Sequence, residues 1–288
     1  MTFDPHQTPT GKPRIAIMGE FSAGKSTLCN ILLRGRALPE QVTATRLPPI
    51  WMSKGKGGDH RVCLDGSTEP VSRGTLDSVP FDDTRLIHLH FQADILDHCD
   101  LIDFPGISDP NMDSEVWERV LVDADAVIWL THATQAWRQS ESAVWDTVPP
   151  EVQAKSVLLV TRFDKLTNPG DRNRVLNRVT RETEGLFDKV FPISLLHALH
   201  GFKDYDQWVA SGAEAFTDHL LNLINTLDDS PPLEHSPQDA PVQTEQPKFN
   251  MAPARTVPRQ VPTGPQIVPR RVKPKGNARR NRPFGITG

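Results

Sequence analysis

Ile15-Ala16-Ile17-Met18-Gly19-Glu20-Phe21-Ser22-Ala23-Gly24-Lys25-Ser26-Thr27 is the stretch that decides the fold. Its four leading apolar residues predict a buried strand, and residues 25–34 have the composition of a helix. The turn between them matches the pattern G-x-x-x-x-G-K-[ST], which is typical of phosphate-binding loops. We therefore expect a strand, a phosphate-binding loop and a helix in direct succession.

The chemistry of phosphate binding explains this spacing. Gly19 lets the chain leave the strand, and Gly24 lets backbone N–H groups approach an anion at the positive end of the helix. Lys25 adds a charge near the β- and γ-phosphates, and the Ser26 hydroxyl suits Mg²⁺. The alternative is a tight strand–helix turn with an accidental lysine. The residues of this loop expected to contact nucleotide are Gly19, Glu20, Phe21, Ser22, Ala23, Gly24, Lys25, Ser26 and Thr27.

Composition indicates a globular protein, with 37% hydrophobic and 24% charged residues among 288. Ten Lys/Arg and no Asp/Glu follow from Lys248 onward, so residues 1–247 carry −4 − 10 = −14 and an acidic body precedes a basic tail. Cys29, Cys63 and Cys99 lack metal-type spacing and suit a reducing compartment. No signal peptide or membrane span is recognisable, so we expect a cytoplasmic protein.

Strand-like and helix-like segments alternate along the chain. Strands are predicted at 50–52, 61–64, 86–91, 100–103, 126–130, 156–160 and 189–193, and helices at 116–122, 140–147, 171–185 and 213–227. This alternation predicts an α/β fold with a doubly wound, mostly parallel sheet. Glycine-rich residues 55–58 predict a hairpin between the strands at 50–52 and 61–64.

Three parts of the chain are expected: a loose N-terminus (1–12), one α/β domain (13–228) and a tail (229–288) that is basic from 248. The tail is rich in proline and lacks apolar periodicity, so we expect it to be disordered. His88 and His90 alternate along one strand and could form a metal pair. A solvated strand face is favoured, because no third ligand stands nearby in the sequence.

Two further loops follow predicted strands and carry polar residues. Asp103-Phe-Pro-Gly106 offers a carboxylate for Mg²⁺ and a backbone N–H for a γ-phosphate, and Thr43 and Thr45 are the hydroxyls available in the loop after the first helix. Thr161-Arg162-Phe-Asp164 offers a carboxylate that can accept both the N1–H and the amino group of guanine. An ordinary turn and a helix-capping aspartate are the alternatives. Ser194 stands where a further base contact is expected.

These motifs, with Leu38-Pro and Val42-Thr-Ala-Thr45, resemble the GTPase domain of the dynamin superfamily, particularly bacterial dynamin-like proteins. The resemblance covers residues 12–227. It implies a P-loop GTPase domain, GTP hydrolysis with Mg²⁺ and dimerisation across the nucleotide face. It also implies a switch threonine at Thr45. Together with the roles argued above, we expect Lys25, Ser26 and Thr45 to act in catalysis, and Ser26, Thr45 and Asp103 to hold the metal.

The sequence departs from this family in several places. Dynamin has a glutamine where Phe21 stands, and Ile107 excludes a glutamine at the other position that could orient water. Arg162 replaces the usual lysine of the base-reading motif. The sequence after the domain shows no helical stalk, so we do not expect membrane fission or filament assembly.

The sequence leaves three functions open. We favour a slow GTPase that is stimulated by dimerisation or by a partner. The alternatives are a nucleotide-gated scaffold with negligible hydrolysis and an RNA- or ribosome-associated GTPase. The basic tail suits a protein partner or an anionic membrane surface, which would place the protein at the inner membrane surface. The lack of a folded RNA module disfavours nucleic acid.

Overall fold

The computed structural model describes residues 11–35, 47–107 and 119–229. The chain divides into two units, Met1–Ser236 and Pro237–Gly288, and all described residues belong to the first. Thr43, Thr45, residues 116–118 of the helix predicted at 116–122 and the proline-rich tail lie outside the described residues, whereas residues 119–121 of that helix are helical.

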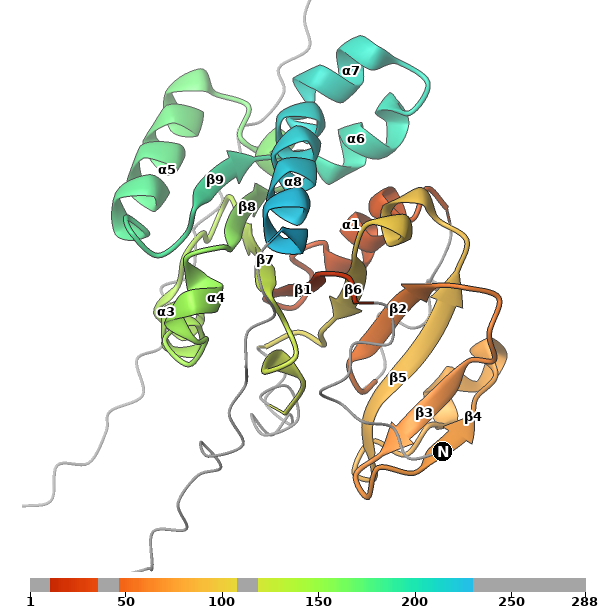
Figure 1. Cartoon of the computed structure of the whole chain (residues 1–288). Helices are drawn as coiled ribbons and strands as arrows, with labels where there is room; N and C mark the ends of the chain where they lie inside the picture. The colour runs from red at the N-terminus through yellow and green to blue at the C-terminus, as the bar shows by residue number, and fades with distance from the viewer. Residues whose placement is uncertain (1–10, 36–46, 108–118, 230–288) are drawn as a thin grey trace, which may run out of the picture. The chain divides into compact units, whose positions relative to one another are not determined.

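Nine strands and seven α-helices make up the described part of the chain (Figure 1). The strands are β1 (Arg14–Gly19), β2 (Ile50–Lys54), β3 (His60–Cys63), β4 (Thr68–Pro70), β5 (Thr84–Phe91), β6 (Asp100–Asp103), β7 (Ala126–His132), β8 (Val157–Thr161) and β9 (Lys189–Pro192). The helices are α1 (Lys25–Leu32), α3 (Gln139–Trp145), α4 (Pro150–Gln153), α5 (Pro169–Glu182), α6 (Leu195–Gly201), α7 (Tyr205–Ala210) and α8 (Ala213–Asp228). No helix in these ranges has the length and apolar character needed to cross a bilayer.

A single mixed sheet has the strand order β4-β3-β5-β2-β6-β1-β7-β8-β9. Parallel pairs join β1 to β6 and β7, β7 to β8, β8 to β9, and β2 to β5. Antiparallel pairs join β2 to β6 and β3 to β4 and β5. The predicted doubly wound, mostly parallel α/β fold is confirmed, with an antiparallel edge.

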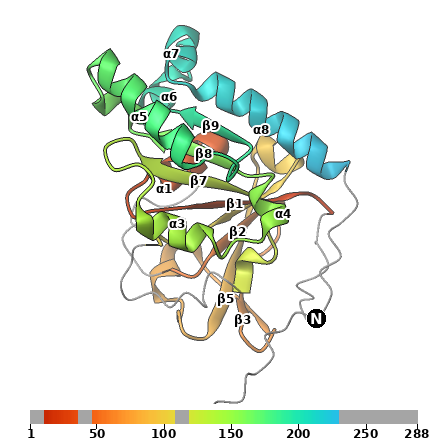
Figure 2. The same cartoon turned by 90° about the vertical axis from the view of Figure 1, so that its left-hand side faces the viewer.

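Helices cover both faces of the sheet (Figure 2). Ile15 and Ile17 of β1 pack in one core with buried residues of α1, α6 and α8. Ala16 and Met18 pack in the other core with buried residues of α3, α4 and α5. These four residues of β1 are each 0% exposed. This burial on two faces is why the strand reads as a continuous apolar run.

The predicted hairpin between β2 and β3 is wrong. β5 lies between them, parallel to β2 and antiparallel to β3. The glycine-rich turn instead passes the end of β5, where Gly55 N donates to Phe91 O at 3.2 Å. Ile87 and Leu89 of β5 are 0% exposed. A position between β2 and β3 gives this eight-residue strand a neighbour on both edges. A local glycine signal carries no information about such long-range pairing.

The predicted solvated face of β5 is also wrong for His88, which is 4% exposed. The β3–β5 register places His60 opposite His88, with ring centroids 5.1 Å apart, and the His88 and His90 rings are 4.5 Å apart. His88 Nε2 lies 2.9 Å from Ser53 Oγ. Within the ranges described, no group of three or more His, Cys, Asp or Glu side chains could hold a metal ion.

We expect this histidine cluster to lower the free energy of unfolding at pH values below neutral. Burial, and then the neighbouring His90 and His60, lower the pKa of His88 to about 3. An unfolded histidine takes up a proton near pH 6.5, so acid favours the unfolded chain. The stabilisation of the folded chain that comes from uncharged His88 is complete above pH 6.5. It decreases as the pH falls, by about 2 kcal/mol between pH 7 and pH 5.

Urea unfolding at pH 5, 6 and 7 measures this effect. His88→Asn should flatten the pH dependence by that amount, whereas His197→Asn, at an exposed position of α6, should leave it unchanged. Equal slopes for wild type and His88→Asn would contradict the expectation.

Candidate functional site

The predicted phosphate-binding loop connects β1 to α1, as the sequence indicates. Gly19 has φ 139°, and a Cβ there would lie 2.1 Å from the Leu130 carbonyl oxygen of β7. Gly24 has φ 102°, and a Cβ there would lie 2.7 Å from Leu195 Cδ1 of α6. Packing against the β7 backbone and a positive φ both require glycine at position 19, and the positive φ favours glycine at position 24. Their neighbours β7 and α6 fix the loop against the sheet.

Lys25 is the first residue of α1 and folds back over the loop. Its Nζ donates to the carbonyl oxygens of Gly19 and Glu20, both at 3.0 Å. Burial lowers the pKa of Lys25, and the charge of Asp103 opposes that shift. The ammonium group is thus held inside the loop.

Asp103 ends β6, beside Ile17 of β1. Its Oδ1 is buried and has no hydrogen-bond partner. Burial raises the pKa of the Asp103 carboxyl to about 6, although the charge of Lys25 and a hydrogen bond with the Cys29 thiol oppose the shift. A buried carboxylate oxygen without a partner next to a phosphate-binding loop fits a hydrated Mg²⁺. Ser26, in the first turn of α1, is the other predicted ligand within the described residues.

The segment after Asp103 packs against the phosphate-binding loop. A Cβ on Gly106 would lie 3.0 Å from Phe21 Cα, and Ile107 N donates to Gly19 O at 3.3 Å. The Gly106 backbone is therefore held at the start of the loop. This is the place from which a backbone N–H could meet a terminal phosphate.

The predicted base-reading segment is bonded directly to the phosphate-binding loop. Thr161 Oγ1 lies 2.8 Å from the Ala23 carbonyl oxygen and 3.1 Å from that of Thr131. Arg162, with φ 52°, donates from a guanidinium nitrogen to Ser22 O at 2.9 Å. These contacts join residues about 140 positions apart in the sequence. They hold the predicted base-reading segment against the phosphate-binding loop.

Asp164 and Ser194 form the far end of the site. Ser194 Oγ donates to Asp164 Oδ1 at 2.9 Å, and it also caps α6 by accepting from His197 N at 3.3 Å. Burial alone would raise the pKa of the Asp164 carboxyl, but the hydrogen bond from Ser194 and the charge of Lys165 bring it below its ordinary value. The side chain is thus an ionised acceptor, 12% exposed.

The structure brings the described candidates together at one edge of the sheet. The phosphate-binding loop, Asp103, the segment Thr161–Asp164 and Ser194 follow β1, β6, β8 and β9 at their carboxyl ends. These strands, with β7, are consecutive neighbours in the sheet. Ligands of open α/β sheets bind at this edge. The role of each side chain in binding nucleotide stays a prediction.

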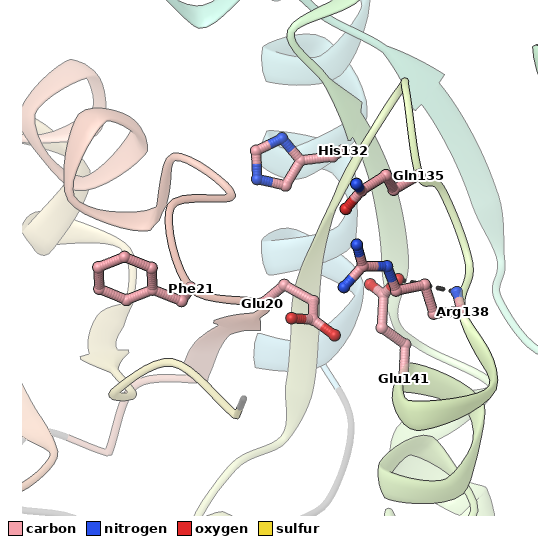
Figure 3. A pocket seen from close by; sticks show the side chains of 6 residues that line it. All are labelled: Glu20, Phe21, His132, Gln135, Arg138 and Glu141. Carbon is pink, nitrogen blue, oxygen red and sulfur yellow. Dashed lines mark hydrogen bonds between the residues drawn. The ribbon is translucent and has the colours of Figure 1, made fainter. Parts of the chain in front are cut away.

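Sequence reasoning missed a second group of residues beside the phosphate-binding loop. A small pocket of about 60 Å³ lies between this loop and the end of β7 (Figure 3). It is lined by Glu20, Phe21, His132, Gln135, Arg138 and Glu141. Burial, and then the charge of Arg162, lower the pKa of His132. The Phe21 ring points away from the other five side chains and is 61% exposed.

Hydrogen bonds from neighbouring residues hold the two glutamates that line this pocket. Ser140 Oγ donates to Glu20 Oε1 at 3.0 Å. Glu141, 1% exposed, accepts from Trp129 Nε1 and Thr131 Oγ1, both at 3.0 Å, and burial raises the pKa of its carboxyl. The same strand-end argument that selected Asp103 and Asp164 could have selected His132, because it is the last residue of β7.

Known proteins are similar to this chain in sequence and in fold. Dynamin-like protein 2 of Campylobacter jejuni is 24% identical over 221 residues, which cover 74% of this chain and 35% of that protein. Two solved structures of an oligomerised bacterial dynamin pair, described as sensing and tethering membranes, share the fold. Their TM-scores are 0.57 and 0.59, at 17% and 18% identity, covering 75% and 73% of this chain and 38% of each of theirs. The chain thus spans little more than a third of the length of these relatives.

A family model described as 50S ribosome-binding GTPase matches residues 14–162. The match begins with β1 and takes in the phosphate-binding loop, Asp103, Gly106 and the start of the base-reading segment. The match covers more than half of the chain, so the chain belongs to this family of GTPases.

Proposed function

We propose that this chain is a Mg²⁺-dependent switch that binds and hydrolyses GTP in a dynamin-like manner, and that a second copy or another partner accelerates turnover. One observation carries the proposal. Thr161 and Arg162 of the base-reading segment bond to Ala23 and Ser22 of the phosphate-binding loop. A loop that selects guanine and a loop that grips phosphate are thereby joined in one site.

Each residue then has a defined role. Backbone N–H groups of the loop and Lys25 stabilise the charge on the transferred phosphoryl group. Ser26 and Asp103, together with Thr45 outside the described residues, would hold Mg²⁺. Such an ion would supply positive charge that offsets the negative charge of the phosphates. Asp164, ionised and fixed by Ser194, accepts from the N1–H and amino group of guanine.

The residues at two positions explain why unassisted turnover should be slow. Phe21 and Ile107 have apolar side chains, which cannot accept a hydrogen bond from an attacking water. The Phe21 backbone lies beside Gly106, where the terminal phosphate is expected, and Phe21 itself is exposed. A group that orients water would then come from a second molecule. Dimerisation across the nucleotide face supplies one.

We expect the rate of phosphate release per molecule to rise at least tenfold as the protein concentration increases through the range of dimerisation. Phosphate release at saturating GTP and Mg²⁺, with Lys25→Ala as the inactive control, measures this rate. Fast release that is independent of concentration would contradict the proposal. Slow release at every concentration with intact GTP binding would favour the scaffold alternative.

The partner of the tail is a separate part of the proposal. Ten Lys/Arg without Asp/Glu from Lys248 onward favour an anionic membrane surface or an acidic protein, since each charge near such a surface adds about 1 kcal/mol. Flotation of the full chain and of a chain ending at residue 247 with anionic liposomes tests the membrane partner. A mobility-shift assay with RNA at increasing salt concentration tests the ribosome-associated alternative.

A further inference from the structure

Glu20 is an acidic residue inside a loop that is predicted to bind an anion. It stands between Gly19 and Phe21, and it is 7% exposed. The Phe21 backbone lies beside Gly106, where the terminal phosphate is expected. A carboxylate that turned toward this phosphate would repel it, because like charges interact strongly where water is excluded. Binding a triphosphate therefore requires the Glu20 carboxylate to be held in another direction.

A hydrogen bond from α3 supplies that direction. Ser140 Oγ donates to Glu20 Oε1 at 3.0 Å, across 120 positions of the sequence. The carboxylate thereby lies in the small pocket beside the loop, on the side of Arg138 and Glu141, whereas the Phe21 ring points away from them (Figure 3). Glutamate has a long, flexible side chain, so without this donor its carboxylate would sample several positions.

Ser140 can hold the carboxylate because its own helix is anchored. The next residue of α3, Glu141, is 1% exposed and accepts from Trp129 Nε1 and Thr131 Oγ1, both at 3.0 Å. These bonds attach the first turn of α3 to β7. The Ser140 hydroxyl is therefore presented at a fixed place beside the phosphate-binding loop.

The base-reading segment, in contrast, contacts the backbone of the loop. Thr161 Oγ1 lies 2.8 Å from Ala23 O, and Arg162 donates to Ser22 O at 2.9 Å. Loss of the Ser140 hydroxyl would leave both of these contacts in place. It would free the glutamate side chain without releasing the backbone of the loop.

We propose that Ser140 is a positioning residue, whose hydroxyl keeps the Glu20 carboxylate in the pocket and away from the terminal phosphate. This inference rests on the proposed function, because the direction of the carboxylate affects binding only if a nucleoside triphosphate occupies the loop. Ser140 itself touches no part of the nucleotide. Its removal weakens the binding of GTP selectively, since GDP lacks the terminal phosphate.

Calorimetry with GDP and with a non-hydrolysable GTP analogue, both in the presence of Mg²⁺, tests this inference without reference to hydrolysis. Ser140→Ala should lower the affinity for the analogue roughly tenfold, the low end for one hydrogen bond to a charged group, and the affinity for GDP by no more than about threefold. Ser140→Thr, which keeps a hydroxyl, should return the ratio of the two affinities to the wild-type value. In a Glu20→Gln background, which has no charge to misplace, Ser140→Ala should leave this ratio unchanged.

Ser142→Ala is the matched control, because it removes a hydroxyl from the same helix, one position beyond the anchoring Glu141. It should keep the wild-type ratio. An unchanged ratio in Ser140→Ala would overturn the inference, and so would an equal loss of affinity for GDP and the analogue. The same fall of the ratio in the Glu20→Gln background would also overturn it, since packing and not charge would then be responsible. Failure of the wild-type chain to bind either nucleotide would instead refute the proposed function.

Discussion

Lys25→Ala is expected to lower the affinity for GTP and for GDP at least a hundredfold. The wild-type ammonium group lies inside the phosphate-binding loop, bonded to the carbonyl oxygens of Gly19 and Glu20. In the proposed complex it would face the β- and γ-phosphates, and hydrogen bonds between charged groups are about twice as strong as neutral ones. Its removal also leaves the two loop carbonyls without their donor. Both effects oppose binding.

Isothermal titration calorimetry with GTP and GDP in the presence of Mg²⁺ measures this loss. Lys54→Ala is the matched control. Lys54 is the last residue of β2 and forms an ion pair with Asp97. Ile50, at the other end of β2, is the residue that lies beside Asp103. The control should bind both nucleotides like wild type. A Lys25→Ala variant that folds and binds GTP within fivefold of wild type would refute the assignment of this loop.

The parts of the fold that the sequence predicts are those in which local pattern and tertiary environment agree. The apolar run at residues 15–18 lies within β1, and the apolar repeat at 213–227 is α8 almost to the residue. α6 was not predicted, because Leu195–Gly201 is too short to show a helical repeat. β4 was not predicted either, since all three of its residues are exposed. Such elements are determined by their neighbours.

The residues of the candidate site divide in the same way, into those that a local pattern predicts and those that depend on tertiary neighbours. Asp103 and Asp164 could be selected because each closely follows a buried strand in a short motif. The pocket beside the phosphate-binding loop could not be predicted from a motif, since Glu141 acts by packing α3 against Trp129 and Thr131 of β7. The burial of His88 likewise depends on β3, which is distant in sequence. Long-range pairing is what local patterns fail to report.

Asp164→Ala should remove the preference for guanine over adenine. The wild-type carboxylate is ionised, 12% exposed and held by Ser194 Oγ at 2.9 Å, so it presents fixed acceptors to a base. Guanine pairs two donors with it, whereas adenine would leave a partly buried charge without a partner. Two hydrogen bonds to a charged group are worth roughly 3–6 kcal/mol, or about 10²–10⁴ in affinity.

Calorimetry on the same preparation measures the affinities for GTP and for ATP, and it shows which of the two the substitution changes. We expect GTP binding to weaken by that factor and ATP binding to stay constant or to improve, because the unpaired carboxylate no longer penalises adenine. Asp171→Ala, at the exposed start of α5 and paired with Arg174, is the control and should keep full discrimination. If Asp164→Ala still prefers GTP a hundredfold, another group reads the base and the role of this carboxylate is structural.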